Sequence, residues 1–183
     1  MLNLNPEQRQ TLLSIARRSI EATLDGHRPE LDPSQFDETL RRMAGAFVSL
    51  HTKDGDLRGC IGSIQAVGPL YEAVSSSAVN AAFRDPRFFP VRREELANIH
   101  IEISVMSPIE RVADVAEIEV GRDGLIISRG SRAGLLLPQV ATNYGWDRET
   151  FLRQTCVKAG LPPESWRLPE CRIERFSAEV FAE

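Results

Sequence analysis

One short segment of the sequence concentrates side chains that could do chemistry. His51 and Cys60 lie on either side of Asp54-Gly55, and Arg58 precedes the cysteine by two residues. A cysteine is nucleophilic as the thiolate, which neighbouring cationic side chains favour, and a histidine can accept the thiol proton. The residue types therefore predict a thiol site in which Cys60 is the nucleophile, His51 its base and Arg58 an anchor for an anion or a carboxylate.

A hairpin is expected to bring these residues together. Residues 45–51 and 57–64 are predicted strands, and Asp-Gly between them is a strong signal for a tight turn. The register predicted for this turn pairs Ser49 with Cys60, His51 with Arg58, and Phe47 with Gly62. Side chains alternate across a strand, so these polar residues share one face, and the apolar residues (Val48, Leu50, Leu57 and Ile61) share the other. Cys60 and His51 are then diagonal neighbours.

The same hairpin also has an interpretation without catalysis. A lone cysteine in a strand is most often a small buried hydrophobe. Gly59 and Gly62 allow a sheet to bend or a helix to lie close, and they also leave backbone groups open to a ligand. A binding role for the hairpin and its two glycines therefore stands beside the catalytic one.

A second polar cluster follows the helix predicted to start at Leu70. The residue before a proline leaves the helical region, so the helix is expected to end at Asp85-Pro86. Asn80, Asp85 and Arg87 are candidate binding residues at this end, because an arginine offers a bidentate fork to a carboxylate or another anion. The structural alternative is an Asp–Arg pair that braces the turn around Pro86.

The elements that must position these residues are predicted from capping residues and hydrophobic periodicity. They are a helix over 5–25, a strand over 99–105, a helix that starts at Asp147, and a strand over 171–181 with a bulge near Arg175 and Phe176. Helices and strands alternate without a regular βαβ pattern. We therefore expect an α+β fold with a mostly antiparallel or mixed sheet flanked by helices.

Composition excludes several functional classes. The chain of 183 residues has a net charge of −4, which gives no electrostatic reason to expect binding to nucleic acid or to an anionic membrane. Its three cysteines form no Cys-x-x-Cys pair, so we expect no metal site and no cofactor, and an odd cysteine count fits a reducing cytoplasm. The first ten residues lack a secretory pattern, and no apolar run is long enough to span a bilayer.

The hexapeptide at 57–62, LRGCIG, resembles the signature of the AMMECR-type domain family, called AmmeMemoRadiSam system protein A in prokaryotes. Further matches extend in order over nearly the whole chain, at residues 47–51, 80–88, 101–105, 135–140, 145–147 and 156–161. The chain departs from the family at Asn143, where an acidic residue is more frequent.

The resemblance implies one domain over residues 1–183. This domain has a main part of sheet and helices, a cleft near the hexapeptide, and a small lobe that the N-terminal helix 5–25 forms with C-terminal segments. Family members often occur beside a Memo-like protein and a radical SAM protein, which suggests shared redox or C–H chemistry. We therefore expect an enzyme or enzyme component with a small-molecule or peptide ligand in the cleft. The alternative is a non-catalytic scaffold that docks the same partners or a small ligand.

Overall fold

The computed structural model describes residues 2–183, which form two compact units. The first unit contains the chain up to Ser107 together with Glu179–Glu183, and the second is Pro108–Ala178. Helices and antiparallel strands occur in both, so the predicted α+β class is confirmed.

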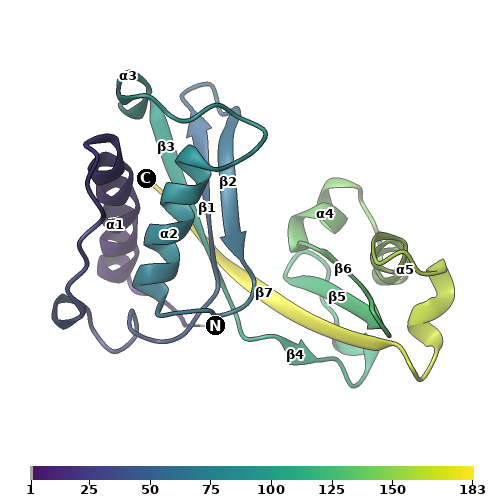
Figure 1. Ribbon diagram of the computed structural model, residues 1–183. Helices are drawn as coiled ribbons and strands as arrows, with labels where there is room; N and C mark the ends of the chain where they lie inside the picture. The colour runs from purple at the N-terminus through teal and green to yellow at the C-terminus, as the bar shows by residue number, and fades with distance from the viewer. Residues whose placement is uncertain (1) are drawn as a thin grey trace. The chain divides into compact units, whose positions relative to one another are not determined.

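In the first unit, two helices cover one face of an antiparallel sheet (Figure 1). The elements of this unit in chain order are α1 (Pro6–Leu24), η1 (Pro33–Gln35), β1 (Ala46–Thr52), β2 (Leu57–Ser63), α2 (Leu70–Phe83), α3 (Arg93–Leu96) and β3 (Ile99–Met106). The sheet is made of β2, β1, β3 and the C-terminal end of β7 (Arg172–Ala182). The helix α1 begins at a capping box, in which the Asn5 side chain accepts from the Gln8 amide and the Gln8 side chain accepts from the Asn5 amide. β1 is an inner strand and pairs with β2 on one side and β3 on the other.

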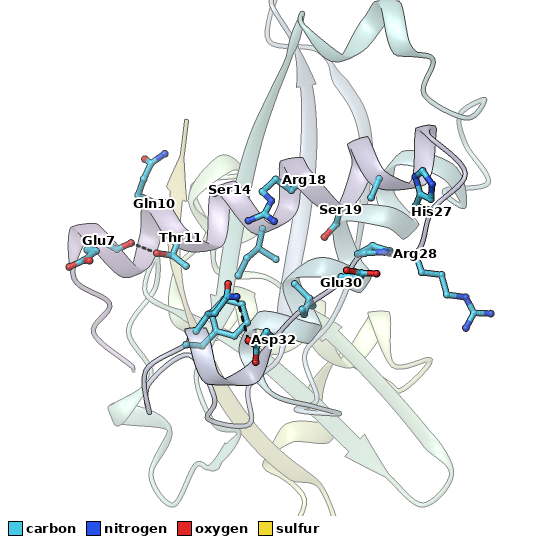
Figure 2. Close-up of a pocket in the computed structure, with 16 residues that line it drawn as sticks. Glu7, Gln10, Thr11, Ser14, Arg18, Ser19, His27, Arg28, Glu30 and Asp32 are labelled. Carbon is cyan, nitrogen blue, oxygen red and sulfur yellow. Dashed lines mark hydrogen bonds between the residues drawn. The ribbon is translucent and has the colours of Figure 1, made fainter.

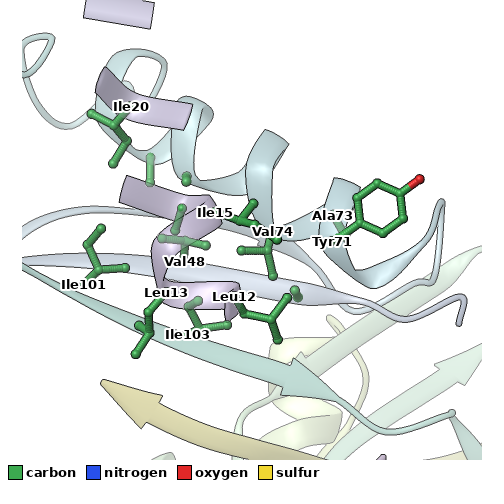
Figure 3. Packing of buried hydrophobic residues seen from close by; sticks show 14 of the residues in the cluster. Leu12, Leu13, Ile15, Ile20, Val48, Tyr71, Ala73, Val74, Ile101 and Ile103 are labelled. Carbon is green, nitrogen blue, oxygen red and sulfur yellow. The ribbon is translucent and has the colours of Figure 1, made fainter. Parts of the chain in front are cut away.

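The core of this unit lies between the sheet and the two helices (Figure 3). Val48 and Leu50 on β1, and Ile101 and Ile103 on β3, are fully buried, and these residues alternate along their strands with less buried ones. They form the face that α1 and α2 cover, which leaves the other face of β1 and β2 to the polar residues of the hairpin.

The second unit has its own core. Its elements are β4 (Glu110–Arg111), η2 (Val115–Glu117), β5 (Asp123–Arg129), β6 (Arg132–Leu136), α4 (Pro138–Asn143), α5 (Arg148–Lys158), η3 (Pro163–Arg167) and β7 (Arg172–Ala182). The predicted N-cap is confirmed, because the Asp147 side chain accepts from the Thr150 amide at the start of α5. Phe151, Leu152 and Cys156 of α5 pack in this core beside β5.

The last strand, β7, belongs to both units. It pairs with β4 and β5 in the second unit, and its last residues join the first unit, where the Glu183 amide donates to the Ile101 carbonyl. The bulge predicted near Arg175 and Phe176 is wrong, since β5 and β7 pair in a continuous register there. The hydrophobic pattern changes phase because Ile173 and Phe176, which alternation places on opposite faces of β7, are both buried, with the Phe176 ring filling the space above Gly124.

The terminal segments differ from the expected small lobe. The sequence suggested that the N-terminal helix forms this lobe with C-terminal segments. Instead, α1 packs on the main sheet of the first unit, with Leu12 and Ile20 fully buried there. The final five residues join the same unit, and Pro108–Ala178 make up the second unit.

Candidate functional site

The β1–β2 hairpin positions the cysteine as the sequence predicts. Ser49 lies opposite Cys60 and Phe47 lies opposite Gly62, so both of these predicted pairs are confirmed. The predicted pairing of His51 with Arg58 is wrong, because the register shifts and His51 faces Leu57. A β-bulge places one extra residue in a strand, and here it moves Arg58 out of the expected position.

The Cys60 thiol has a hydroxyl donor directly across the hairpin. Ser49 Oγ donates to Cys60 Sγ at 3.2 Å, and the cysteine is half-buried. His51 lies on the same face of β1, and its Nε2 atom is buried without a hydrogen-bond partner among residues 2–183.

An Asp–Arg pair holds the backbone of Cys60. β2 is an edge strand, and at Cys60 its free peptide groups point away from β1. The Cys60 amide donates to Asp85 Oδ2 at 2.9 Å, and Arg87 Nη2 donates to the Cys60 carbonyl at 3.3 Å. Asp85 and Arg87 therefore act on the edge as a neighbouring strand would, and we call them the edge clamp.

The two side chains of the edge clamp are also bonded to each other. Arg87 Nε donates to Asp85 Oδ1 at 2.9 Å and Arg87 Nη2 donates to Asp85 Oδ2 at 2.7 Å, in a bidentate pair. The side-chain bonds from Arg87, together with those from the Cys60 and Arg87 amides, hold the pKa of Asp85 well below its usual range. The bond to Asp85 raises the pKa of Arg87. The opposite charges of Asp85 and Arg87 offset each other, so the clamp fixes the backbone of Cys60 without adding a net charge beside it.

Arg58 is engaged elsewhere, on the helix α3. Its Nε and Nη2 atoms donate to the two carboxylate oxygens of Glu95, at 2.9 and 3.3 Å, and these bonds lower the pKa of Glu95. The Phe88 ring lies near the guanidinium groups of both Arg58 and Arg87, at 6.0 and 5.4 Å. Arg58 thus ties the hairpin to the segment between α2 and β3.

Two cavities flank Arg58. One has a volume of about 500 Å³ and is lined by the hairpin turn, including Lys53, and by Asn98. The other has a volume of about 370 Å³ and is lined by Phe89 and Arg92. Arg58 and Glu95 line both cavities, so a ligand in either would meet this ion pair.

The two hairpin glycines are required by close packing. A Cβ atom on Gly59 would lie 2.2 Å from the Ala81 carbonyl oxygen of α2, and one on Gly62 would lie 2.3 Å from the Ala46 carbonyl oxygen. Any larger side chain at either position would displace backbone. The geometry therefore favours a packing role: Gly59 allows the close approach of α2, and Gly62 allows the close approach of β1.

The remaining candidates are less connected to the thiol. Asn80 is half-buried near the end of α2, and its backbone carbonyl accepts from the Arg84 amide. Cys156 is buried and Cys171 is half-buried in the second unit, and burial raises the pKa of both thiols. In the part of the chain that the structure describes, no cluster of His, Cys, Asp or Glu is arranged to hold a metal ion, and no helix could cross a membrane.

Sequence reasoning located Cys60 and Arg58 but missed one hydrogen-bond partner of each. The register already placed Ser49 opposite Cys60, which was a signal for the hydroxyl donor. The bond from Cys60 to Asp85 and the partner of Arg58, Glu95, depend on contacts 25 and 37 residues apart in the chain. No local pattern marks such contacts.

Comparison with known proteins gives consistent matches over nearly the full chain. A family model described as AMMECR1 matches residues 13–181. A protein of Methanothermobacter thermautotrophicus is 47% identical over 186 residues, covering 98% of this chain and 96% of that protein. Protein TK0174 of Thermococcus kodakarensis is 43% identical over 192 residues, covering 100% and 94%. The crystal structure of an uncharacterized protein, PH0010 from Pyrococcus horikoshii, matches with a TM-score of 0.80 and 41% identity, over 94% of this chain and 90% of that one.

Proposed function

The chain belongs to the AMMECR1 family, and from this premise we propose that it is an enzyme component that acts through Cys60 on the LRGCIG hairpin. The observation that carries the proposal is the bond from Ser49 Oγ to Cys60 Sγ at 3.2 Å. The thiol is only half-buried, so a ligand can reach it, and the hydroxyl across the hairpin fixes its position; both features support a reactive role.

The rigid support of β2 around Cys60 is a second argument for a reactive role of this cysteine. The edge clamp fixes the peptide groups of Cys60, and Gly59 packs directly on α2, so the sulfur is held on a supported strand. Reactive groups need such support, because a poorly placed nucleophile loses much of its rate. The surroundings of Cys60 therefore suit a reaction at a defined position.

The proposed chemistry is attack by the sulfur on an electrophilic carbon. A sulfur–carbon bond forms, the leaving group departs with its bonding electrons, and the thiol proton passes to His51. Nε2 of His51 has no other partner among the described residues, which leaves it available as the base. Arg58 would hold a carboxylate or another anion of the ligand from the cavities that it lines, in competition with Glu95.

We further propose that the reaction involves the Memo-like and radical SAM proteins that accompany this family. The test is to co-express the chain with both proteins from one genome and to map covalent adducts on each cysteine by mass spectrometry. An adduct or product that requires Cys60, and that persists in Cys171→Ala, supports the proposal. A product formed equally by Cys60→Ala would remove the cysteine from the mechanism. The three free cysteines are consistent with a cytoplasmic setting, where this reaction would take place.

A docking role is the second candidate, and a different residue favours it. Phe89 is 88% exposed and lines the smaller cavity beside Arg58. Exposed aromatic side chains next to arginines are typical of interface hot spots. In this case Phe89→Ala would abolish co-purification with the two partners, whereas Cys60→Ser would leave it intact. The opposite result, in which Phe89→Ala still co-purifies with the partners and Cys60→Ser does not, would favour the catalytic proposal.

A further inference from the structure

A groove runs along the outer side of α1, away from the hairpin. The chain reverses at Gly26, which has a φ of +75°, and residues 27–36 return alongside the helix. We call these residues the return segment. Between the helix and the return segment lies a cavity of about 900 Å³, within the range of ligand sites (Figure 2).

The dimensions of the groove suit an extended chain better than a compact molecule. Its helical wall runs from Glu7 to Ala22, which corresponds to about 22 Å along the axis. A volume of about 900 Å³ over that length gives a mean cross-section of about 40 Å². An extended peptide with its side chains occupies about 4.8 Å by about 10 Å, or about 48 Å², so it would fill the groove with some side chains directed out to solvent. The length of about 22 Å accommodates six or seven of its residues.

The base of the groove is apolar and firmly supported. Ile15 of α1 is buried there, and Leu31 and Phe36 of the return segment pack against the core of the first unit. The Phe36 ring stacks on Tyr71 of α2 at 4.4 Å between centroids. These side chains offer an apolar surface that exists before any ligand binds.

The walls of the groove supply polar groups that have few partners of their own. Arg18 is directed from α1 toward the return segment and has no ion-pair partner among residues 2–183 (Figure 2). The peptide groups of residues 28–31 make no backbone hydrogen bond within the described chain. Glu7 lines the N-terminal end of the groove, and Arg28, Glu30 and Asp32 line it on the return segment, so charges of both signs are arranged along its length. Asp32 already accepts hydrogen bonds from Ser34.

We propose that this groove binds an extended peptide of about six residues, with apolar side chains on its base and an acidic side chain on Arg18. The unpaired peptide groups of the return segment would bond the backbone of the bound peptide, as an exposed strand edge does. Charge complementarity with Arg18 selects the acidic residue, because a guanidinium binds a carboxylate in a bidentate geometry. The site is separate from Cys60 and does not depend on the proposed function.

The test is an affinity selection from a library of acetylated, amidated hexapeptides on the full chain, read by mass spectrometry. Wild-type protein should enrich peptides that carry Asp or Glu at one position and apolar residues at its neighbours. Arg18→Glu should reverse the preference at that position to Lys or Arg and weaken the wild-type peptides about tenfold, as expected for loss of a charge-assisted hydrogen bond.

Two further variants test whether the peptides bind in the groove: one blocks the groove, and the other is a control outside it. Ser14→Trp places a bulky side chain on the exposed helix face inside the groove and should abolish enrichment, whereas Arg111→Glu on β4 should change nothing. An absence of enrichment with wild-type protein, or a preference that Arg18→Glu leaves unchanged, would overturn the proposal. Sedimentation of the same variants tests for a second copy of the chain: a dimer that dissociates in Ser14→Trp would assign the groove to self-association instead.

Discussion

Replacing Asp85 with asparagine tests the edge clamp without changing the size of the side chain. The carboxylate is almost fully buried, with 1% of the side chain exposed, and both of its oxygens accept hydrogen bonds. Oδ1 accepts from the amide and the Nε of Arg87, and Oδ2 accepts from the Cys60 amide and from Arg87 Nη2. An asparagine has one oxygen and one NH2 group, so in either orientation a donor faces a donor.

The expected loss of stability depends on which hydrogen-bond donors lose their acceptor. A buried amide such as that of Cys60 costs about 1–3 kcal/mol when it is left unsatisfied. Arg87 is about half exposed, with 54% of its side chain accessible, so water replaces most of what its guanidinium loses. Asp85→Asn should therefore lower the free energy of unfolding by about 2 kcal/mol.

The assay is urea unfolding of wild type, Asp85→Asn and the control Asp54→Asn, whose carboxylate is exposed at the hairpin turn. The control should change stability by less than about 0.5 kcal/mol. Because the pKa of Asp85 is lowered in the folded protein, its contribution is complete above the unfolded pKa of about 3.9 and is lost as the pH falls toward the folded value. The difference between wild type and Asp85→Asn should therefore shrink below about pH 4. Equal stability of the two proteins at pH 7 would refute the clamp.

Three other substitutions or measurements follow from the same structure. Gly59→Ala should destabilise the protein by about 1–3 kcal/mol in urea unfolding, because its Cβ would meet backbone at 2.2 Å, whereas Gly68→Ala, with its nearest atom at 3.6 Å, should cost less than about 1 kcal/mol. Asn5→Ala removes the capping box of α1 and should cost about 1 kcal/mol, measured by thermal unfolding followed by circular dichroism at 222 nm. Cys156 should react with iodoacetamide more slowly than Cys171 in the native protein, because it is fully buried; equal rates would contradict its burial.

Local rules predicted most of the helices and strands. The capping box at Asn5, the Asp-Gly turn and the strict alternation from Ile99 to Val105 each depend on residues close in the chain, and each is confirmed. The opposition of Ser49 and Cys60 was predicted from the Asp-Gly turn and the alternation of apolar residues, and it is confirmed although the register shifts between Leu50 and His51.

Long-range packing explains the two features of the strands that local rules did not predict. The bulge moves Arg58 out of its predicted pairing, and Arg58 instead donates two hydrogen bonds to Glu95, a residue 37 positions away. The phase change of the last strand, which was predicted to be a bulge near Arg175 and Phe176, instead reflects the burial of Ile173 on one face and of Phe176, against Gly124, on the other. Both outcomes depend on neighbours that periodicity within one segment does not contain.

The central claim is that Cys60 is a functional thiol. The most direct measurement is the rate of iodoacetamide alkylation of each cysteine in the native protein at pH 7, in wild type and in Ser49→Ala. The account predicts that Cys60 reacts faster than Cys156 and Cys171, and that loss of the Ser49 hydroxyl slows Cys60 alone. A Cys60 that stays unmodified until the protein unfolds, or whose rate Ser49→Ala leaves unchanged, would contradict it.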